Sequence, residues 1–177
     1  MITVEIDKLT HCLVNSETGE EVPTFVKKIK KSSELSNMRK REWYENWKNL
    51  FSKYEVYVLL ADGDDRIQGA VALENSYESD AVYFAWAVAA PWNNKMFVKQ
   101  PAYIGVGAHL FAIACNISKK YGHDGVIYGF AANEKLLRHY CDDLGAEPLR
   151  ILHPYQFILE KKNAKMLMEE YTYDENY

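Results

Sequence analysis

The stretch Ile104-Gly105-Val106-Gly107-Ala108 stands at the beginning of an apolar stripe with helical spacing. Apolar residues recur three or four positions apart as far as Tyr121, and Gly122 is a typical helix end. The spacing therefore predicts a helix over residues 104–121. Because its first turn consists of small residues, a ligand could approach the backbone closely there.

The beginning of a helix attracts anions. Its first four N–H groups have no partner within the helix, and the aligned peptide dipoles place about half a positive charge at that end. A phosphate group binds well in such a position. Two glycines one residue apart are a weak signal by themselves, because a glycine turn also lets a helix pack closely on a sheet. A second element has to separate these interpretations.

That second element is a helix predicted from Asn133 to Gly145, with Leu136, Tyr140 and Leu144 on one face. Together with the glycine turn, it resembles the GNAT superfamily of N-acetyltransferases. The cofactor motif of that family reads Gln/Arg-x-x-Gly-x-Gly/Ala, and its next helix commonly reads Asn-x-x-Ala-x-x-x-Tyr before a Leu-Gly-Phe-like end. The resemblance extends from about Tyr54 to Tyr171.

Several apolar runs surround these two helices. Residues 55–61 and 67–73 flank the turn Asp62-Gly63-Asp64-Asp65 and should pair as an antiparallel hairpin. A third run, residues 81–90, ends at Pro91, which cannot donate to a sheet ladder. Further strands are expected at 125–131, around 149–151 and at 155–159, and a last helix near 164–171.

The first part of the chain precedes this core. Residues 1–25 indicate short extended pieces around a turn at Glu17-Thr18-Gly19. Residues 36–53 have the spacing of an amphipathic helix, with Trp43 and Trp47 on its aromatic, core-facing side.

The order of elements predicts an α/β (α+β) fold. The resemblance implies a GNAT-like mixed, mostly antiparallel central sheet, with helices on both faces and a splay between the two central strands. We expect one domain over residues 1–177. Residues 1–53 form its opening strand or hairpin and aromatic helix, residues 54–171 its cofactor-binding core, and residues 172–177 a loose tail.

Composition excludes several classes of partner. The 177 residues carry a net charge of −4, so no positive field attracts nucleic acid or an anionic membrane. No apolar run approaches the roughly 20 residues that span a bilayer. The three cysteines match no disulfide framework or metal pattern, so we expect a reduced, cytoplasmic protein without a metal site.

The resemblance implies a function. The chain would move an acetyl group from acetyl-CoA directly to a primary amine of a small molecule or peptide, without a metal, possibly as a homodimer. The backbone of strand 81–90 would bind the pantetheine arm, and an N–H near Val88 the oxyanion. Asn133 would contact the pantetheine side, and Tyr140 the sulfur. The predicted cofactor-binding residues are Ala87, Val88, Ala89, Ile104, Gly105, Val106, Gly107, Ala108, Asn133 and Tyr140.

Tyr140 has the family role of protonating the leaving thiolate. A phenol with a pKa near 10 gives its proton to a thiolate with a pKa near 8.5 at a cost of about 2 kcal/mol. Tyr140 would therefore act as a hydrogen-bond donor or need a lowered pKa. Because Tyr140 shares a stripe with Leu136 and Leu144, it also fits an ordinary core position.

The sequence departs from the family at two positions. Ala102 stands where Gln or Arg is usual, so Lys95 or Lys99 would supply the phosphate contact. Val82 stands where some members have a Glu, so Glu74 becomes the candidate base, with Glu78 and Asp80 as alternatives acting through water. These departures leave open a non-catalytic module that binds acyl-CoA or a partner.

The acceptor side is expected near the splay. Trp86 and Trp92 flank it and are the candidate substrate-binding residues. The segment from Trp92 to Tyr103 is longer than the link usual in the family, and long loops in compact domains are often functional lids.

Overall fold

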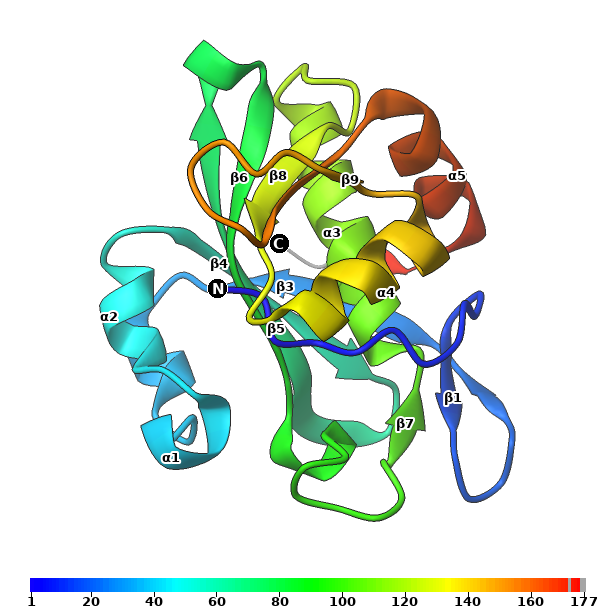
Figure 1. The fold of residues 1–177 in the computed structure, drawn as a ribbon. Coiled ribbons are helices and arrows are strands. Elements are labelled where there is room, and N and C mark those ends of the chain that lie inside the picture. The colour runs from blue at the N-terminus through cyan, green and yellow to red at the C-terminus, as the bar shows by residue number, and fades with distance from the viewer. Residues whose placement is uncertain (172, 176–177) are drawn as a thin grey trace.

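A central sheet of eight strands organises the computed structural model, which describes residues 1–171 and 173–175 (Figure 1). Its order is β11-β3-β4-β5-β6-β8-β10-β9. Neighbours run antiparallel except β6 with β8 and β11 with β3. The strands are β3 (Thr24–Lys28), β4 (Glu55–Ala61), β5 (Asp64–Ser76), β6 (Ala81–Ala89), β8 (Ile127–Phe130), β9 (Glu147–Pro148), β10 (Gln156–Leu159) and β11 (Asp174–Glu175). The predicted mixed, mostly antiparallel sheet is confirmed.

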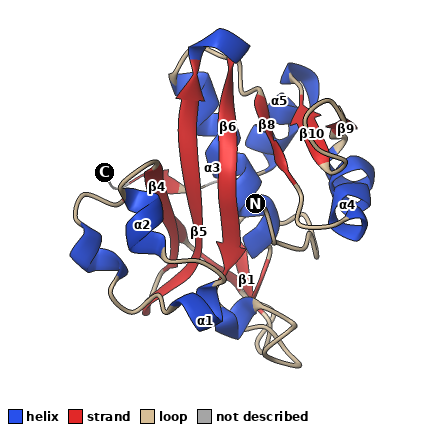
Figure 2. Cartoon of the chain, turned by 60° about the vertical axis from the view of Figure 1, so that its left-hand side comes forward, coloured by secondary structure: helices blue, strands red, loops and turns tan. Residues whose placement is uncertain are grey.

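Helices cover both faces of this sheet (Figure 2). Three of them, α3 (Val106–Lys120), α4 (Glu134–Leu144) and α5 (Lys161–Glu170), bury their apolar stripes in the main core. The short helices α1 (Lys40–Trp43) and α2 (Trp47–Phe51) and the 3-10 turn η1 (Ser32–Leu35) pack on the other face, where Trp43 and Trp47 belong to a second core. The predicted core role of these tryptophans is confirmed.

The single helix predicted over residues 36–53 is wrong. Tyr44 adopts a left-handed conformation with φ 61°, which ends α1 after one turn. The side chain of Asn46 then accepts hydrogen bonds from the backbone of Lys48 (3.1 Å) and Asn49 (3.4 Å), so α2 begins as a separate helix. The apolar spacing continues across the break because both helices bury their tryptophans in the same core.

The opening hairpin forms as predicted. Strands β1 (Leu13–Asn15) and β2 (Glu21–Val22) pair across a turn in which Gly19 has φ 74°. Strand β1 also pairs with β7 (Tyr103–Ile104), which gives a small sheet of order β2-β1-β7. This sheet holds the hairpin beside the beginning of α3.

Two expectations near the C-terminus need correction. The strand expected around residues 149–151 lies at β9 instead, because Arg150 has φ 51° and Ile151 is 76% exposed. Residues 174–175, expected within a loose tail, form β11 beside β3. Residues 172, 176 and 177 lie outside the described residues.

Candidate functional site

The two central strands separate halfway along their length. β6 and β8 pair in parallel from Val82 with Ile127 to Phe84 with Gly129. At the next residue the register of β6 against β5 shifts, and Ala85 forms a bulge that bends the strand. Beyond this point a gap opens between β6 and β8, which is the predicted splay.

The gap is occupied by the N-terminal segment, residues Met1–Thr10. Ile2 bridges both strands in parallel, to Ala87 on one side and to Ala131 on the other. Its N–H donates to the carbonyl of Phe130 (2.9 Å), and its carbonyl accepts from the N–H of Ala132 (2.9 Å). Figure 2 shows this segment starting between β6 and β8, and Figure 1 shows it continuing past α4 toward β1.

Side chains of the N-terminal segment alternate as in a strand. Ile2, Val4 and Ile6 are buried in the main core, whereas Glu5 and Asp7 are exposed. The sequence analysis predicted extended pieces here but gave them no place in the site. The apolar residues at every second position are the signal that could have identified this strand.

The glycine turn faces the N-terminal segment. Gly105 has φ 93°, and no side chain caps α3 among the described residues. The Gly105 N–H donates to Oδ1 of Asp7 (3.1 Å). A Cβ added at Gly107 would lie 2.1 Å from the carbonyl oxygen of Glu5, and one at Gly105 would lie 2.1 Å from Oγ1 of Thr10. The turn therefore has glycines where another part of the chain approaches its backbone.

The beginning of α4 lies on the other side of the N-terminal segment. Oδ1 of Asn133 accepts from the N–H of Leu136 (2.9 Å), so this side chain caps its own helix. The Lys135 ammonium lies 3.8 Å from Oε1 of Glu5. Asn133 thus makes a structural contact, and its predicted contact with a cofactor stays a prediction.

Tyr140 is fully buried between the aromatic rings of Phe111 and Phe157. Its hydroxyl donates to the carbonyl oxygen of Val4 (2.7 Å). Burial raises the pKa of Tyr140 well above its usual value of 10.0. The hydroxyl points to the N-terminal segment, which makes it a hydrogen-bond donor in a water-free place.

The backbone of β6 presents Ala87 to the gap. The Ala87 carbonyl accepts from the N–H (3.1 Å) and Oγ1 (2.9 Å) of Thr3. The N–H of Ala90 donates to Gln68 on β5 (2.9 Å). Backbone groups of successive residues point to opposite sides of a strand, so Val88 is directed to β5, and Ala89 shares the direction of Ala87. The oxyanion contact predicted near Val88 therefore fits Ala87 better.

The two candidate substrate tryptophans pack against the second core. Nε1 of Trp92 donates to Oε1 of Gln68 (2.9 Å), and its ring packs edge-on against Trp43 with centroids 6.0 Å apart. Trp92 lines a pocket of about 450 Å³ whose walls also include Arg66. Trp86 is half-buried against the second core. Whether either residue touches a substrate stays a prediction.

Glu74 lies on β5, opposite the end of β6 that pairs with β8. It is exposed and stands opposite Tyr83 in the ladder. Ala87 is four residues farther along, roughly 13 Å at the rise of a strand. At that distance its carboxylate could reach a group beside Ala87 through water and not directly, and its role as a base stays a prediction.

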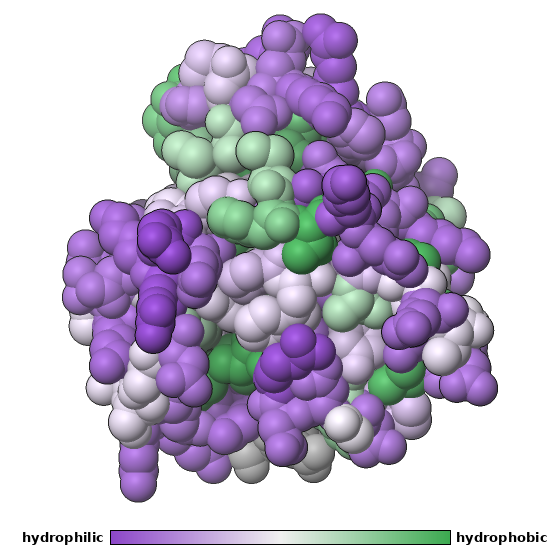
Figure 3. Space-filling view, turned by 90° about the horizontal axis from the view of Figure 1, so that it is seen from below, coloured by the Kyte–Doolittle hydropathy of each residue, from purple (hydrophilic) through white to green (hydrophobic). Residues whose placement is uncertain are grey.

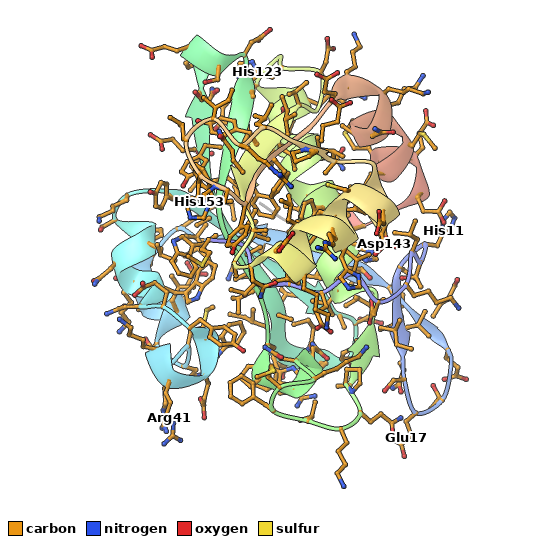
Figure 4. All side chains as sticks on the ribbon, viewed as in Figure 1. His11, Glu17, Arg41, His123, Asp143 and His153 are labelled. Atoms are coloured by element: carbon orange, nitrogen blue, oxygen red, sulfur yellow. The ribbon has the colours of Figure 1, made fainter. Side chains whose placement is uncertain are left out.

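An aromatic group that the sequence analysis missed covers the face of the sheet opposite α3. Tyr83 stacks on Tyr128 with centroids 5.2 Å apart and meets the edge of Phe130 at 6.0 Å, and Phe130 contacts His153 at 5.7 Å. Burial, followed by the charges of neighbouring groups, raises the pKa of Tyr83 to about 12. In Figure 4 His153 lies on the loop beside the sheet, whereas His123 lies at the upper end of the molecule. Alternation of Tyr83 with the buried Val82 and Phe84 is the signal that could have placed these rings.

The loop expected to be a lid is fixed at its base. The N–H of Ala102 donates to the carbonyl of Trp92 (2.9 Å), and that of Tyr103 donates to Oδ1 of Asn93 (2.9 Å). Nδ2 of Asn93 donates in turn to Oε1 of the buried Gln68 (2.9 Å). Lys95 and Lys99 are exposed on this loop. Figure 3 views this lower end of the molecule, which is largely hydrophilic with smaller apolar patches.

Membrane-spanning helices and metal-binding groups are both absent from the described part of the chain. No helix there has the length and apolar character to cross a membrane. No three His, Cys, Asp or Glu side chains gather there in a way that could hold a metal ion.

Comparison with known proteins finds similar solved structures but no match by sequence. No family model matches the sequence, and no curated protein matches it. A crystal structure of AtaTR bound with AcCoA is similar at a TM-score of 0.56 and 18% identity, covering 82% of this chain and 98% of that one. A structure of a tyrosine-to-phenylalanine mutant of the AtaT toxin has a TM-score of 0.51 and 15% identity, with 81% and 93% covered.

The expectation about partners is contradicted. A further similar structure, of the AtaT-AtaR complex bound to DNA, has a TM-score of 0.46 and 17% identity, covering 69% of this chain and 77% of that one. The two structures with a TM-score above 0.5 are described as AtaTR bound with AcCoA and as an AtaT toxin mutant, and neither is described with an amine. The expected small-molecule or peptide amine partner therefore does not describe these similar proteins.

The fold itself follows from several independent features. The sheet is mixed and mostly antiparallel, its two central strands splay after a bulge, and a glycine turn begins the helix that follows. Known structures with the same arrangement span four fifths of the chain. This chain has the GNAT-like fold.

Proposed function

We propose that this chain is an acyltransferase that takes an acetyl group from acetyl-CoA and passes it directly to a primary amine. The observation that carries the proposal is the gap between β6 and β8, which leads to the uncapped beginning of α3. Support also comes from the AtaTR structure, which shares this fold and is described as bound with AcCoA.

The pyrophosphate would lie at the glycine turn. The N–H groups at the start of α3 have no partner in the helix, and the helix dipole favours an anion there. The Asp7 carboxylate, which already accepts a hydrogen bond from Gly105, shows that an anionic oxygen fits the place. Lys135 at the beginning of α4, with Lys95 or Lys99 from the loop, would add positive charge.

The pantetheine arm would run along the open side of β6. Ala87 directs its backbone into the gap, where it now bonds to Thr3. The same backbone could pair with the amides of the arm, and its N–H could hold the oxygen of the tetrahedral intermediate. Ala89 lies farther along the same edge.

The reaction needs a neutral amine, which attacks the thioester carbon. The C–N bond forms, the C–S bond breaks, coenzyme A leaves as a thiolate, and the proton that the attacking nitrogen loses passes to water. Tyr140 would face that sulfur as a hydrogen-bond donor, because its raised pKa makes a full proton transfer even less favourable than for a free phenol. The oxygen of Val4, to which its hydroxyl now donates, would have to leave first.

The distance of Glu74 from the gap bears on the acceptor. An alkyl amine with a pKa of about 10.4 loses its proton at neutral pH at a cost of about 4 to 5 kcal/mol, whereas an α-amino group with a pKa near 7.7 needs about 1 kcal/mol. With the carboxylate reaching the amine through water at best, the site suits an amine of low pKa. Tyr83, Tyr128 and Phe130 would line the side from which it approaches.

One observation favours a second function, a non-catalytic module of the same fold that binds acyl-CoA or a partner. The N-terminal segment fills the gap, and the candidate base Glu74 pairs with Tyr83, four residues before Ala87 on β6. In that case the protein would bind coenzyme A or a partner without turnover.

A single assay separates the two functions. The protein is mixed with acetyl-CoA and amines of different pKa while released thiol is measured, and cofactor binding is followed by calorimetry. Turnover that increases as the pKa of the amine falls supports the transferase. Saturable binding without thiol release from any amine supports the module.

Tyr140→Phe tests the role of the hydroxyl. We expect kcat to fall about a hundredfold, the usual contribution of a positioned proton donor, while the ring keeps its packing. Tyr77→Phe is the control, because Tyr77 is 75% exposed and far from the gap in sequence and in the sheet. An unchanged kcat in the Tyr140 variant would contradict the role.

A further inference from the structure

We propose that the N-terminal segment is a built-in mimic of the cofactor, which closes the site until acetyl-CoA displaces it. The inference rests on the proposed function, because it takes the gap as the cofactor site. It adds to the proposed function a regulation of cofactor binding, because a segment of the same chain would have to leave before the cofactor could bind.

The segment uses the backbone edges that an arm of the cofactor would use. Thr3 bonds to the open side of β6 at Ala87, and Ile2 bonds to β8 at Phe130 and to Ala132 just beyond it. These bonds satisfy both edges of the gap at once. A pantetheine arm could bond to either edge only after they break.

The acidic side chains of the segment also lie where the cofactor would place its negative charges. Asp7 places a carboxylate oxygen 3.1 Å from the Gly105 nitrogen, at the positive end of α3. Two residues earlier, Glu5 faces the ammonium of Lys135 at 3.8 Å. Two acidic side chains of the segment thus stand beside the groups that would hold the negative charges of a pyrophosphate.

The segment also holds the hydroxyl proposed to act at the sulfur. Tyr140 donates to the Val4 carbonyl, which lies between the strand-like part at Ile2 and the acidic part at Glu5 and Asp7. Along the chain, the segment therefore meets first the backbone proposed for the arm, then the hydroxyl proposed for the sulfur, and then the groups proposed for the charged end of coenzyme A. One displacement would free all three sets of groups.

There is no room for both occupants at the glycine turn. The carbonyl oxygen of Glu5 lies so close to Gly107 that a Cβ there would be 2.1 Å from it. Next to Gly105 lies Oγ1 of Thr10, a buried hydroxyl for which the described residues offer no hydrogen-bond partner.

The test uses the full chain and weakens the segment at two separate points. Gly107→Ala places a methyl group against the carbonyl of Glu5, and alanine is a residue that the GNAT motif accepts at this position. Asp7→Ala removes the carboxylate from the Gly105 N–H. Glu20→Ala is the matched control, because it removes an exposed carboxylate from the β1–β2 hairpin.

Affinity for coenzyme A is measured by calorimetry, and exchange of the Ile2 and Thr3 amides by hydrogen-exchange mass spectrometry. We expect the affinity to rise about tenfold in Gly107→Ala and about threefold in Asp7→Ala, with Glu20→Ala unchanged. Saturating coenzyme A should expose the Ile2 and Thr3 amides in the unmodified protein.

Two results would overturn the inference in distinguishable ways. If coenzyme A binds all four proteins equally and the Ile2 and Thr3 amides stay protected, the segment is a permanent strand and the proposed function stands. If none of the four proteins binds coenzyme A, the proposed function fails and this inference fails with it.

Discussion

The beginnings of α3 and α4 border the same gap and are built in opposite ways. α4 begins at Asn133, whose extended backbone and side-chain oxygen satisfy the N–H of Leu136. α3 begins at Gly105, which has a left-handed backbone and no capping side chain. Its first N–H is satisfied from 98 residues away, by Asp7.

This difference shows where an anion can bind. A helix that caps itself leaves little of its positive end for a ligand, whereas a helix that begins with glycine leaves its N–H groups to whatever approaches. Both helix N-termini have the same dipole, so the presence or absence of a capping side chain decides which of them can bind an anion. The following predictions test this contrast from its largest expected effect to its smallest.

Acid should destabilise the α3 side first, through His109 in the second turn of the helix. Its Nδ1 lies 2.9 Å from the Gly105 carbonyl, so this nitrogen carries the hydrogen and donates it, while Nε2 is buried without a partner among the described residues. Burial lowers the pKa of His109 from 6.5 to about 4. The folded state therefore disfavours the proton that the unfolded chain accepts near pH 6.5.

The contribution of His109 to the free energy of unfolding should be constant above pH 6.5 and decrease by about 3 kcal/mol as the pH falls to 4. Urea unfolding across this range measures the slope. His109→Gln should remove it, and His139→Gln, which alters a half-buried histidine of α4, is the matched control. Both proteins share the slopes of the Met1 amino group, whose pKa burial lowers from 8.0 to about 5, and of the Glu34 and Asp64 carboxylates, whose pKa values are lowered to about 2. A slope of the same size in His109→Gln and in the unmodified protein would refute the assignment.

Gly105→Ala should lower the free energy of unfolding by about 2 kcal/mol, because a Cβ is strained at φ 93° and would also press on Thr10. Gly122 provides a matched control. It has φ 91° and no atom within 4 Å of the added Cβ, so Gly122→Ala measures the backbone strain alone. Equal losses in the two variants, by urea unfolding, would show that the Thr10 contact costs nothing.

Asn133→Ala should have the smallest effect, a loss of about 1 kcal/mol, because it removes a helix cap and nothing larger. Asn133→Ser should restore most of it. Affinity for coenzyme A, measured in the same variants, tests the predicted cofactor contact. If the serine variant recovers stability but not affinity, Asn133 has both roles. If affinity never changes, its role is capping alone.

Local rules predicted both of these helix beginnings. Asn133 and Gly145 bound α4 where cap residues place its ends, and Gly63 turns the β4–β5 hairpin where the sequence has its turn residues. Each of these features depends on neighbours in the chain. Tyr44 does not follow such a rule, since a tyrosine with positive φ has no sequence signature and the tryptophan spacing continues through it.

The sequence predicted the two motifs of the site, and it did not predict which segment lies between them. The glycine turn and the Tyr140 helix each follow a recognisable pattern, but Ile2 meets Ala87 across about half of the chain. Alternation at Ile2, Val4 and Ile6 indicates a strand without naming its neighbours. Such long-range pairing depends on the completed sheet, so the sequence left the occupant of the gap unidentified.

The closed base of the loop from Trp92 to Tyr103 also matters for engineering the protein. Bonds from Ala102 to Trp92 and from Tyr103 to Asn93 join the two ends of the loop, so its tip can change length without moving the glycine turn. Met96 at this tip is 82% exposed. A fluorophore or an affinity tag inserted there would report on the protein while leaving the gap, its occupant and the beginning of α3 in place.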